Sequence, residues 1–123
     1  ATPPNRDIQK SALGATETVD WEHFETIKDC IAALREKKCE VLTVEQSDRS
    51  VMLHEFVPQQ DKRYALIFGN EVDGVSDFAM SYCDTCIEIP QFGMKHSLNI
   101  SVSAGIVIWD FARKLQLTNK ETL

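Results

Sequence analysis

Two polar loops of the chain carry residue types that could do chemistry. The first, G-N-E-V-D-G over residues 69–74, sets an amide and two carboxylates between two glycines, directly after the apolar run 65–68. The second follows another short apolar run and reads I-P-Q-F-G-M-K-H-S-L-N over residues 89–99. Glycine allows tight turns and close approach of the backbone. Both loops therefore predict polar groups displayed at the end of a buried strand, where open α/β sheets bind their ligands.

The first loop has the glycine frame of a phosphate-binding loop but not its charge. Gly69 and Gly74 match G-x-x-x-x-G, yet Val75 and Ser76 stand where that motif requires Lys followed by Ser or Thr. The carboxylate of Glu71 repels phosphate and suits a guanidinium, a hydroxyl or a cationic ligand instead. The G-x-G-x-x-G dinucleotide fingerprint is absent as well. An unrelated phosphate-binding α/β enzyme remains an alternative that this loop chemistry disfavours.

The elements that would position these loops alternate between helix and strand, which is typical of a layered α/β domain with a mainly parallel sheet. The clearest helix is expected to begin at an N-cap on Asp20, because apolar residues recur at helical spacing through Leu34. The last segment, 98–117, is rich in β-branched residues, but its length favours a largely buried helix. The other expected elements are strands over 39–45, 64–69 and 86–89, a short helix before Pro58 and another over 75–82.

Composition limits the chain to one domain and to few kinds of partner. Its 123 residues, 43% hydrophobic and 26% charged, fit a single domain with an ordinary core. No apolar run approaches the roughly 18 to 20 residues of a membrane span, and the first ten residues do not resemble a signal peptide. We therefore expect an intracellular protein without a membrane partner. The net charge of -6 gives no overall attraction to nucleic acid, so any RNA binding must be local.

The four cysteines are not arranged as a metal site or a redox motif. Cys30 and Cys39 lie nine positions apart, so they do not form a second zinc knuckle to match Cys83-x-x-Cys86. A thioredoxin-type C-x-x-C opens a helix, whereas this one leads into the strand-like C-I-E-I-P. We expect small apolar residues beside a buried strand, and no bound metal.

The two loops with their flanking segments resemble a known family. ALIFGNEVDGVS and IPQFGMKHSLNISVSAGIVIWDFAR resemble the second and third signature motifs of the SpoU branch of the SPOUT methyltransferases. KSALGA and VDWEHFETIKDCIAALREKKCEVLTVE resemble the middle region of that family, so the resemblance extends over residues 8–115. It implies a homodimeric, cytoplasmic, trefoil-knotted α/β domain with a Rossmann-like parallel sheet. The implied reaction uses S-adenosyl-L-methionine to methylate a ribose 2′-hydroxyl of tRNA or rRNA.

The resemblance also implies roles for individual residues. Glu71, Ser97 and Asn99 match motif positions that line the catalytic site, although Ser and Asn at the start of a helix are more often caps. Lys95 and His96 flank the site and are the candidates for contact with RNA phosphate. The residues implied to hold the cofactor, largely through their backbones, are Phe68, Gly69, Asn70, Gly74, Ile89, Pro90, Gln91, Ser97 and Leu98.

Two departures from the family pattern leave an alternative open. Gln91 stands where the third motif usually has Met, which we expect to change packing on the adenine. The first motif, with an Asn and an Arg, should precede KSALGA by several tens of residues, so the chain starts too late to contain it. We therefore expect residues 1–123 to be a single, N-terminally incomplete SpoU-type domain. The alternative is a non-catalytic SPOUT-like module that serves cofactor binding or dimerisation.

Overall fold

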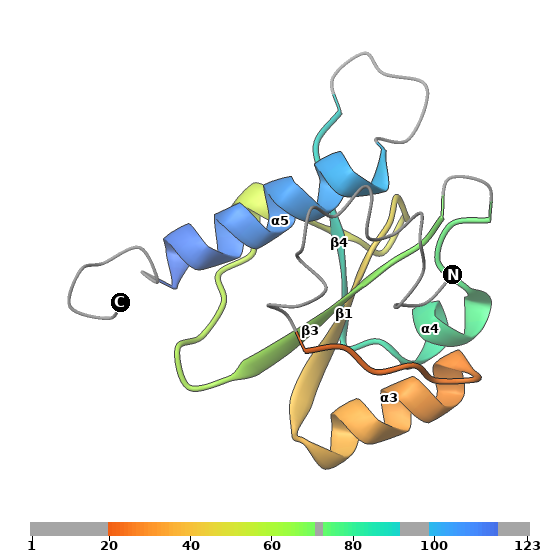
Figure 1. The fold of residues 1–123 in the computed structure, drawn as a ribbon. Coiled ribbons are helices and arrows are strands. Elements are labelled where there is room, and N and C mark those ends of the chain that lie inside the picture. Colours follow the sequence, from red (N-terminus) through yellow and green to blue (C-terminus); the bar gives the residue numbers. More distant parts are fainter. Residues whose placement is uncertain (1–19, 71–72, 92–98, 116–123) are drawn as a thin grey trace.

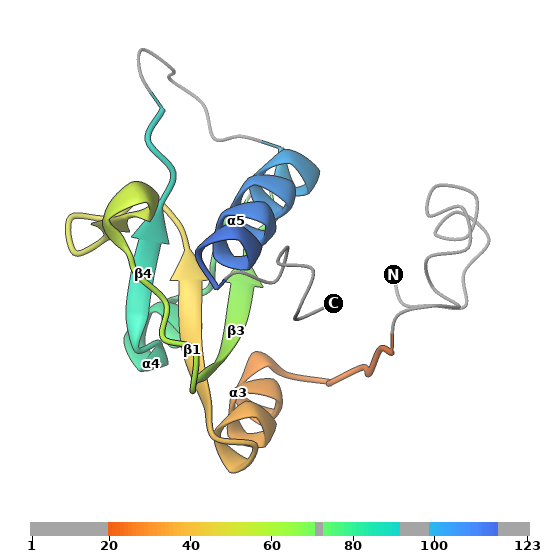
Figure 2. The ribbon, with the colours of Figure 1, turned by 90° about the vertical axis from the view of Figure 1, so that its left-hand side faces the viewer.

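Four parallel strands form one sheet in the computed structural model, which describes residues 20–70, 73–91 and 99–115. The strand order is β2-β4-β1-β3. Figure 2 shows the arrowheads of β4, β1 and β3 pointing the same way, so their carboxyl ends lie along one edge of the sheet, here called the carboxyl edge. The strands span Cys39–Val44 (β1), Val51–Met52 (β2), Arg63–Phe68 (β3) and Thr85–Glu88 (β4).

Helices cover both faces of this sheet (Figure 1). One face carries α3 (Ile27–Glu36) and α4 (Asp77–Tyr82), while the other carries α5 (Ile100–Lys114) and the short 3-10 helix η1 (Leu53–Glu55). None of the helices within the described ranges is long and apolar enough to cross a membrane. The expected α/β architecture is thus confirmed, as is the helical nature of the last segment.

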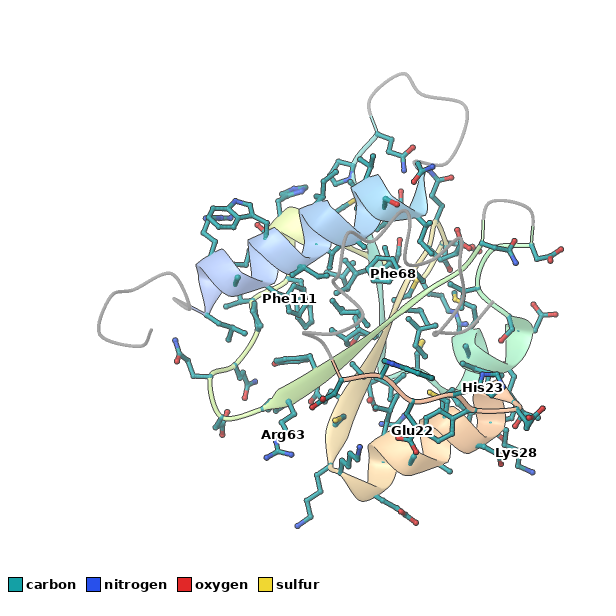
Figure 3. All side chains as sticks on the ribbon, in the orientation of Figure 1. Glu22, His23, Lys28, Arg63, Phe68 and Phe111 are labelled. Carbon is teal, nitrogen blue, oxygen red and sulfur yellow. The ribbon has the colours of Figure 1, made fainter. Side chains whose placement is uncertain are left out.

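The larger core lies between α5 and the sheet. Leu42 and Ile87, from the central strands, are fully buried against Val107 of α5. Figure 3 shows Phe68 and Phe111 lying between α5 and the sheet, whereas Arg63 projects at the opposite end of β3. Because side chains alternate along a strand, β1 also presents fully buried Val41 and Thr43 to the other face. The helix α5 is therefore fixed firmly above the strands that lead to the carboxyl edge.

The four cysteines are free thiols, with Cys86 buried and the other three partly buried. The Thr43 hydroxyl donates to Cys83 Sγ at 3.4 Å, and the Cys86 thiol donates to the carbonyl of Glu45 at 3.4 Å. Within the described residues, no group of three or more His, Cys, Asp and Glu side chains could hold a metal ion. Cys39 and Cys86 lie in β1 and β4 and Cys83 lies just before β4, as expected for small residues beside a strand, whereas Cys30 lies in α3.

One expected boundary is wrong, and one strand was not expected. The first helix begins at an N-cap on Thr26, whose hydroxyl accepts from Asp29 N at 3.1 Å, and not at Asp20. Trp21 and Phe24 precede this helix, so their helical spacing does not reflect helical structure. The segment before Pro58 contains β2 as well as the short helix, because Val51–Met52 pair with β4.

Asp84 ties three elements together just before β4. Its Oδ2 accepts from Val41 N at 2.7 Å and from Arg35 Nη1 at 2.5 Å. Burial alone would raise the pKa of this carboxyl, but the Val41 N–H and the Arg35 guanidinium outweigh it and hold the pKa below its usual value. A depressed folded-state pKa means that the stabilisation is present above the unfolded-state pKa and is lost as the pH falls through the folded-state value.

We expect Asp84→Asn to lower the free energy of unfolding at pH 7, where the wild-type carboxylate is charged. The difference between the two proteins should shrink as the pH falls below about 4, the ordinary pKa range of aspartate. Urea unfolding at several pH values between neutral and acid measures this difference. A difference that stays constant down to strongly acidic pH would show that the charge of Asp84 does not stabilise the fold.

Candidate functional site

The two loops singled out by sequence begin at the same edge of the sheet. β3 ends at Phe68, and the chain continues into the first loop through Gly69 and Asn70. β4 ends at Glu88, and the chain continues into the second loop through residues 89–91. β1 lies between these two strands, and Glu45 follows its last residue. Segments about 20 residues apart in sequence are therefore brought to either side of one central strand, as the parallel arrangement predicted.

The first loop folds back on its own start. Gly74 N donates to the carbonyl of Asn70 at 3.1 Å, and Asp73 N donates to Asn70 Oδ1 at 2.6 Å. A Cβ added to Gly69 would overlap the Gly74–Val75 peptide, so the backbone approaches Gly69 too closely for any side chain. Gly74 itself has a φ of 68°, the left-handed region that favours glycine. Both glycines are thus required by the shape of the loop, in which Glu71 lies outside the described residues.

Glu45 fastens this loop to the central strand, a role that the sequence analysis missed. Its Oε2 accepts from Val75 N at 3.0 Å, and its Oε1 accepts from Gln46 N at 3.0 Å. The only local signal for this role was an acidic residue placed directly after a buried strand. The partner at Val75 lies 30 residues away and becomes visible only in the folded chain.

The second loop presents a buried acceptor at the end of β4. Ile89 packs in the core beneath α5, and Pro90 and Gln91 follow it. Gln91 Oε1 is buried and has no hydrogen-bond partner among the described residues. A buried acceptor left unpaired costs on the order of 1–3 kcal/mol, so this oxygen suits a ligand that donates a hydrogen bond. The remaining predicted residues of this loop lie outside the described ranges: Lys95, His96, Ser97 and Leu98.

Asn99 is the N-cap of α5. Its Oδ1 accepts from Ser101 N at 2.8 Å, and its carbonyl accepts from Ser103 N at 2.9 Å. The interpretation of Asn99 as a helix-start residue is confirmed. Capping uses one lone pair of the side-chain oxygen, so the amide nitrogen is the donor that Asn99 has for a separate chemical role.

The charges described around the carboxyl edge include several carboxylates. Asp73 belongs to the first loop, and Glu45 accepts a hydrogen bond from the end of that loop. Glu88 ends β4 and accepts from the Ser50 hydroxyl at 2.6 Å. Acidic groups and a buried amide oxygen favour a ligand with positive charge and hydrogen-bond donors over a polyphosphate. The bent first loop adds backbone groups that a ligand can approach closely, since Gly69 has no side chain.

Comparisons with known proteins agree with this arrangement. The profile of the SpoU rRNA Methylase family matches residues 1–109. The chain is 32% identical over 117 residues to a 23S rRNA (guanosine-2′-O-)-methyltransferase RlmB of Neisseria meningitidis, covering 95% of this chain and 46% of that protein. It spans about half the length of the curated relatives it matches.

Solved structures give the same result. The crystal structure of the A. aeolicus TrmH/SpoU tRNA modifying enzyme matches with a TM-score of 0.77 and 26% identity, over 89% of this chain and 55% of that one. An AdoMet-bound rRNA methyltransferase from Sinorhizobium meliloti matches with a TM-score of 0.62 and 25% identity, over 70% and 32% of the two chains. The family profile extends over both loops at the carboxyl edge. The chain therefore belongs to the SpoU rRNA methylase family.

Proposed function

We propose that this chain forms the S-adenosyl-L-methionine-binding part of an RNA methyltransferase that modifies a ribose 2′-hydroxyl of tRNA or rRNA. The observation that carries the proposal is the convergence of the two family loops at the carboxyl edge. There β3 leads into the closed turn at Gly69, and β4 leads to Gln91, whose Oε1 has no hydrogen-bond partner among the described residues. β1 lies between these two strands. The relatives named above include an AdoMet-bound rRNA methyltransferase and a tRNA modifying enzyme.

The chemistry of the described residues fits this cofactor. Its adenine amine donates hydrogen bonds, which the buried Gln91 Oε1 would accept. Its sulfonium carries a positive charge, which the carboxylates near the edge favour and a phosphate-binding loop would not. We propose that the contacting residues, mainly through their backbones, are Phe68, Gly69, Asn70, Gly74, Ile89, Pro90, Gln91, Ser97 and Leu98.

The proposed role of the protein in the reaction is mainly positioning. When bound, S-adenosylmethionine supplies a methyl group activated by its attachment to a sulfonium. Ser97 and Asn99 would hold the ribose hydroxyl in line with that methyl group, which lowers the entropic barrier to displacement. A ribose hydroxyl is too weak an acid to attack unaided at neutral pH. The resemblance assigns its activation to an arginine of the first motif, which Glu71 would orient.

RNA is proposed to approach through the second loop. Lys95 and His96 flank the proposed site, where Lys95 supplies a positive charge and His96 a ring N–H for a ribose-phosphate backbone. Such a local contact is consistent with a net charge of -6, which gives no general affinity for nucleic acid. A cytoplasmic location, where tRNA and rRNA are accessible, belongs to the same proposal.

We further propose that the protein is a homodimer that buries the outer face of α5. Val102, Ile106 and Trp109 recur at helical spacing on that face, and Trp109 is 59% exposed. No described element covers α5 on the side away from the sheet (Figures 1 and 2), and all three side chains of this row are exposed. An apolar row of this length on the outside of a helix is typical of an interface. A second copy of the same face would cover it symmetrically.

Trp109→Glu is expected to convert the dimer into a monomer, because a carboxylate cannot be buried in an apolar interface without a partner. Sedimentation velocity should give twice the 13.9 kDa chain mass for the wild type and the single-chain mass for the variant. Trp21→Glu is the matched control, since Trp21 is 49% exposed and lies outside α5. A monomeric wild type, or a Trp109→Glu protein that remains dimeric, would contradict the interface.

Methyl transfer itself tests the proposed function. The intact enzyme should transfer the labelled methyl group of S-adenosylmethionine to tRNA or rRNA, and the modified nucleotide should resist alkaline cleavage because its 2′-oxygen is blocked. Cofactor binding without transfer to either RNA class would instead favour the alternative, a non-catalytic module for cofactor binding or dimerisation.

A further inference from the structure

Glu45 lies at the carboxyl edge, directly after β1 and between the ends of β4 and β3. Its backbone N donates to the carbonyl of Ile87 in β4 at 3.0 Å, and its carbonyl accepts from the Cys86 thiol at 3.4 Å. These contacts fix the backbone of Glu45 against β4. Its side chain extends the other way, to the loop that follows β3.

The carboxylate holds that loop by its backbone. Oε2 accepts from Val75 N at 3.0 Å, which is a charge-assisted bond to a main-chain donor. The Val75 side chain is buried against Ile31 and Ala79, so the loop is fixed from the helix side as well. Val75 is therefore held by the Glu45 carboxylate at its backbone and by Ile31 of α3 and Ala79 of α4 at its side chain.

Gly74 is fitted to this carboxylate. A Cβ on Gly74 would overlap Glu45 Oε2, so the glycine makes room for the glutamate. The same Gly74–Val75 peptide is the one that approaches Gly69 too closely for a side chain. The glutamate contact and the start of the loop thus act on a single peptide unit.

We infer that Glu45 is a positioning residue that sets the first loop in the shape required for cofactor binding, an inference that rests on the proposed function. The carboxylate fixes the Gly74–Val75 peptide, and this peptide in turn fixes the turn at Gly69 that the cofactor would contact. Without the carboxylate, Val75 N loses its acceptor and the loop has a wider range of conformations. Glu45 therefore contributes to cofactor affinity and not to the methyl-transfer step.

Three substitutions separate the length of the side chain from its charge. Glu45→Gln keeps an oxygen that can accept from Val75 N, whereas Glu45→Asp keeps the charge but is one methylene too short to reach it. Glu45→Ala removes both. The matched control is Glu40→Ala, because Glu40 lies at the start of the same strand and pairs with Lys62 at 2.6 Å.

Calorimetric titration with S-adenosylmethionine measures the dissociation constant of each variant, and thermal unfolding is recorded in parallel. We expect Glu45→Ala and Glu45→Asp to weaken binding about tenfold or more, the scale of a hydrogen bond to a charged group. Glu45→Gln should stay within about threefold of the wild type, and Glu40→Ala should bind as the wild type does. In the intact enzyme, Glu45→Asp should raise the KM for the cofactor and leave kcat nearly unchanged.

The outcomes separate this inference from the proposed function. If the wild type binds S-adenosylmethionine and Glu45→Asp binds it with the same affinity, the inference about Glu45 is overturned while the proposed function stands. Glu45→Asp also decides the question if Glu45→Ala does not fold. Equal weakening by Glu45→Asp and Glu40→Ala also overturns it, since the loss would then reflect general destabilisation. A folded wild type that binds no S-adenosylmethionine overturns the proposed function and the inference with it.

Discussion

Gly69→Ala is expected to weaken S-adenosylmethionine binding by at least about a hundredfold while most of the fold is kept. The added Cβ would overlap the carbonyl group of Gly74 and the nitrogen of Val75, all of which are backbone atoms. Backbone cannot rotate away as a flexible side chain can, so the loop must open. Opening removes the turn at the end of β3 and also pulls Val75 N away from Glu45. The expected magnitude, about 2.8 kcal/mol or more in binding free energy, is twice the tenfold step of about 1.4 kcal/mol.

Gly105→Ala provides the matched control for this prediction. A Cβ at Gly105 meets nothing within 4 Å in the single chain, because the residue is exposed on α5. It lies on the same face as Val102 and Trp109, so the added methyl group would meet the proposed dimer interface and not the cofactor site. Alanine in a helix interior is more stable than glycine by roughly 0.5–1 kcal/mol, so this variant should unfold at a higher temperature and bind the cofactor normally. Normal binding by Gly69→Ala would show that the closed turn is not part of the cofactor site.

Asn99 offers the second large effect, because its two proposed roles can be separated. Aspartate caps helices as well as asparagine does, so Asn99→Asp should keep the bond from Ser101 N, whereas Asn99→Ala should lose about 1 kcal/mol of stability. Neither variant retains the amide donor. If the amide holds the ribose hydroxyl, both variants of the intact enzyme should lose roughly 100-fold or more in methyl transfer, the scale of one lost donor at a reacting group.

Single-turnover methyl transfer to RNA, measured at saturating cofactor, distinguishes the two roles of Asn99. Loss of activity in both variants, with normal stability in Asn99→Asp, would support the chemical role. Full activity in Asn99→Asp with reduced stability in Asn99→Ala would mean that Asn99 serves α5 only as its cap.

The parts of the fold that depend on local pattern could be predicted from the sequence. The apolar runs that became β1, β3 and β4 are strands, and their parallel alignment brings both loops to one edge. β1 and β4 carry buried side chains as expected, whereas β3 is the edge strand of the described sheet and its side chains are at most partly buried, so the expectation that 65–68 is a buried strand is wrong. The last segment was correctly predicted from its length to be a helix despite its β-branched residues, but the expectation that it is largely buried is wrong, because only Val107 and Phe111 are buried against the sheet. Tertiary packing outweighs intrinsic propensity in such a segment.

The parts that depend on contacts between distant residues could not be predicted. β2 has two residues and exists because Val51 and Met52 pair with β4, far along the chain. Glu45 likewise finds its partner at Val75 only after β1 and β3 are side by side. The error at the start of α3 was different, since the T-x-x-D pattern at Thr26 was present but the spacing of Trp21 and Phe24 suggested an earlier start.

Calorimetric titration of the folded 123-residue chain with S-adenosylmethionine tests the central claim most directly, because it asks whether the two loops at the carboxyl edge hold the cofactor. We predict saturable binding with one cofactor per chain, which should be lost in Gly69→Ala and kept in Gly105→Ala. A chain that is folded by circular dichroism and releases no binding heat at any accessible cofactor concentration or temperature would contradict the claim.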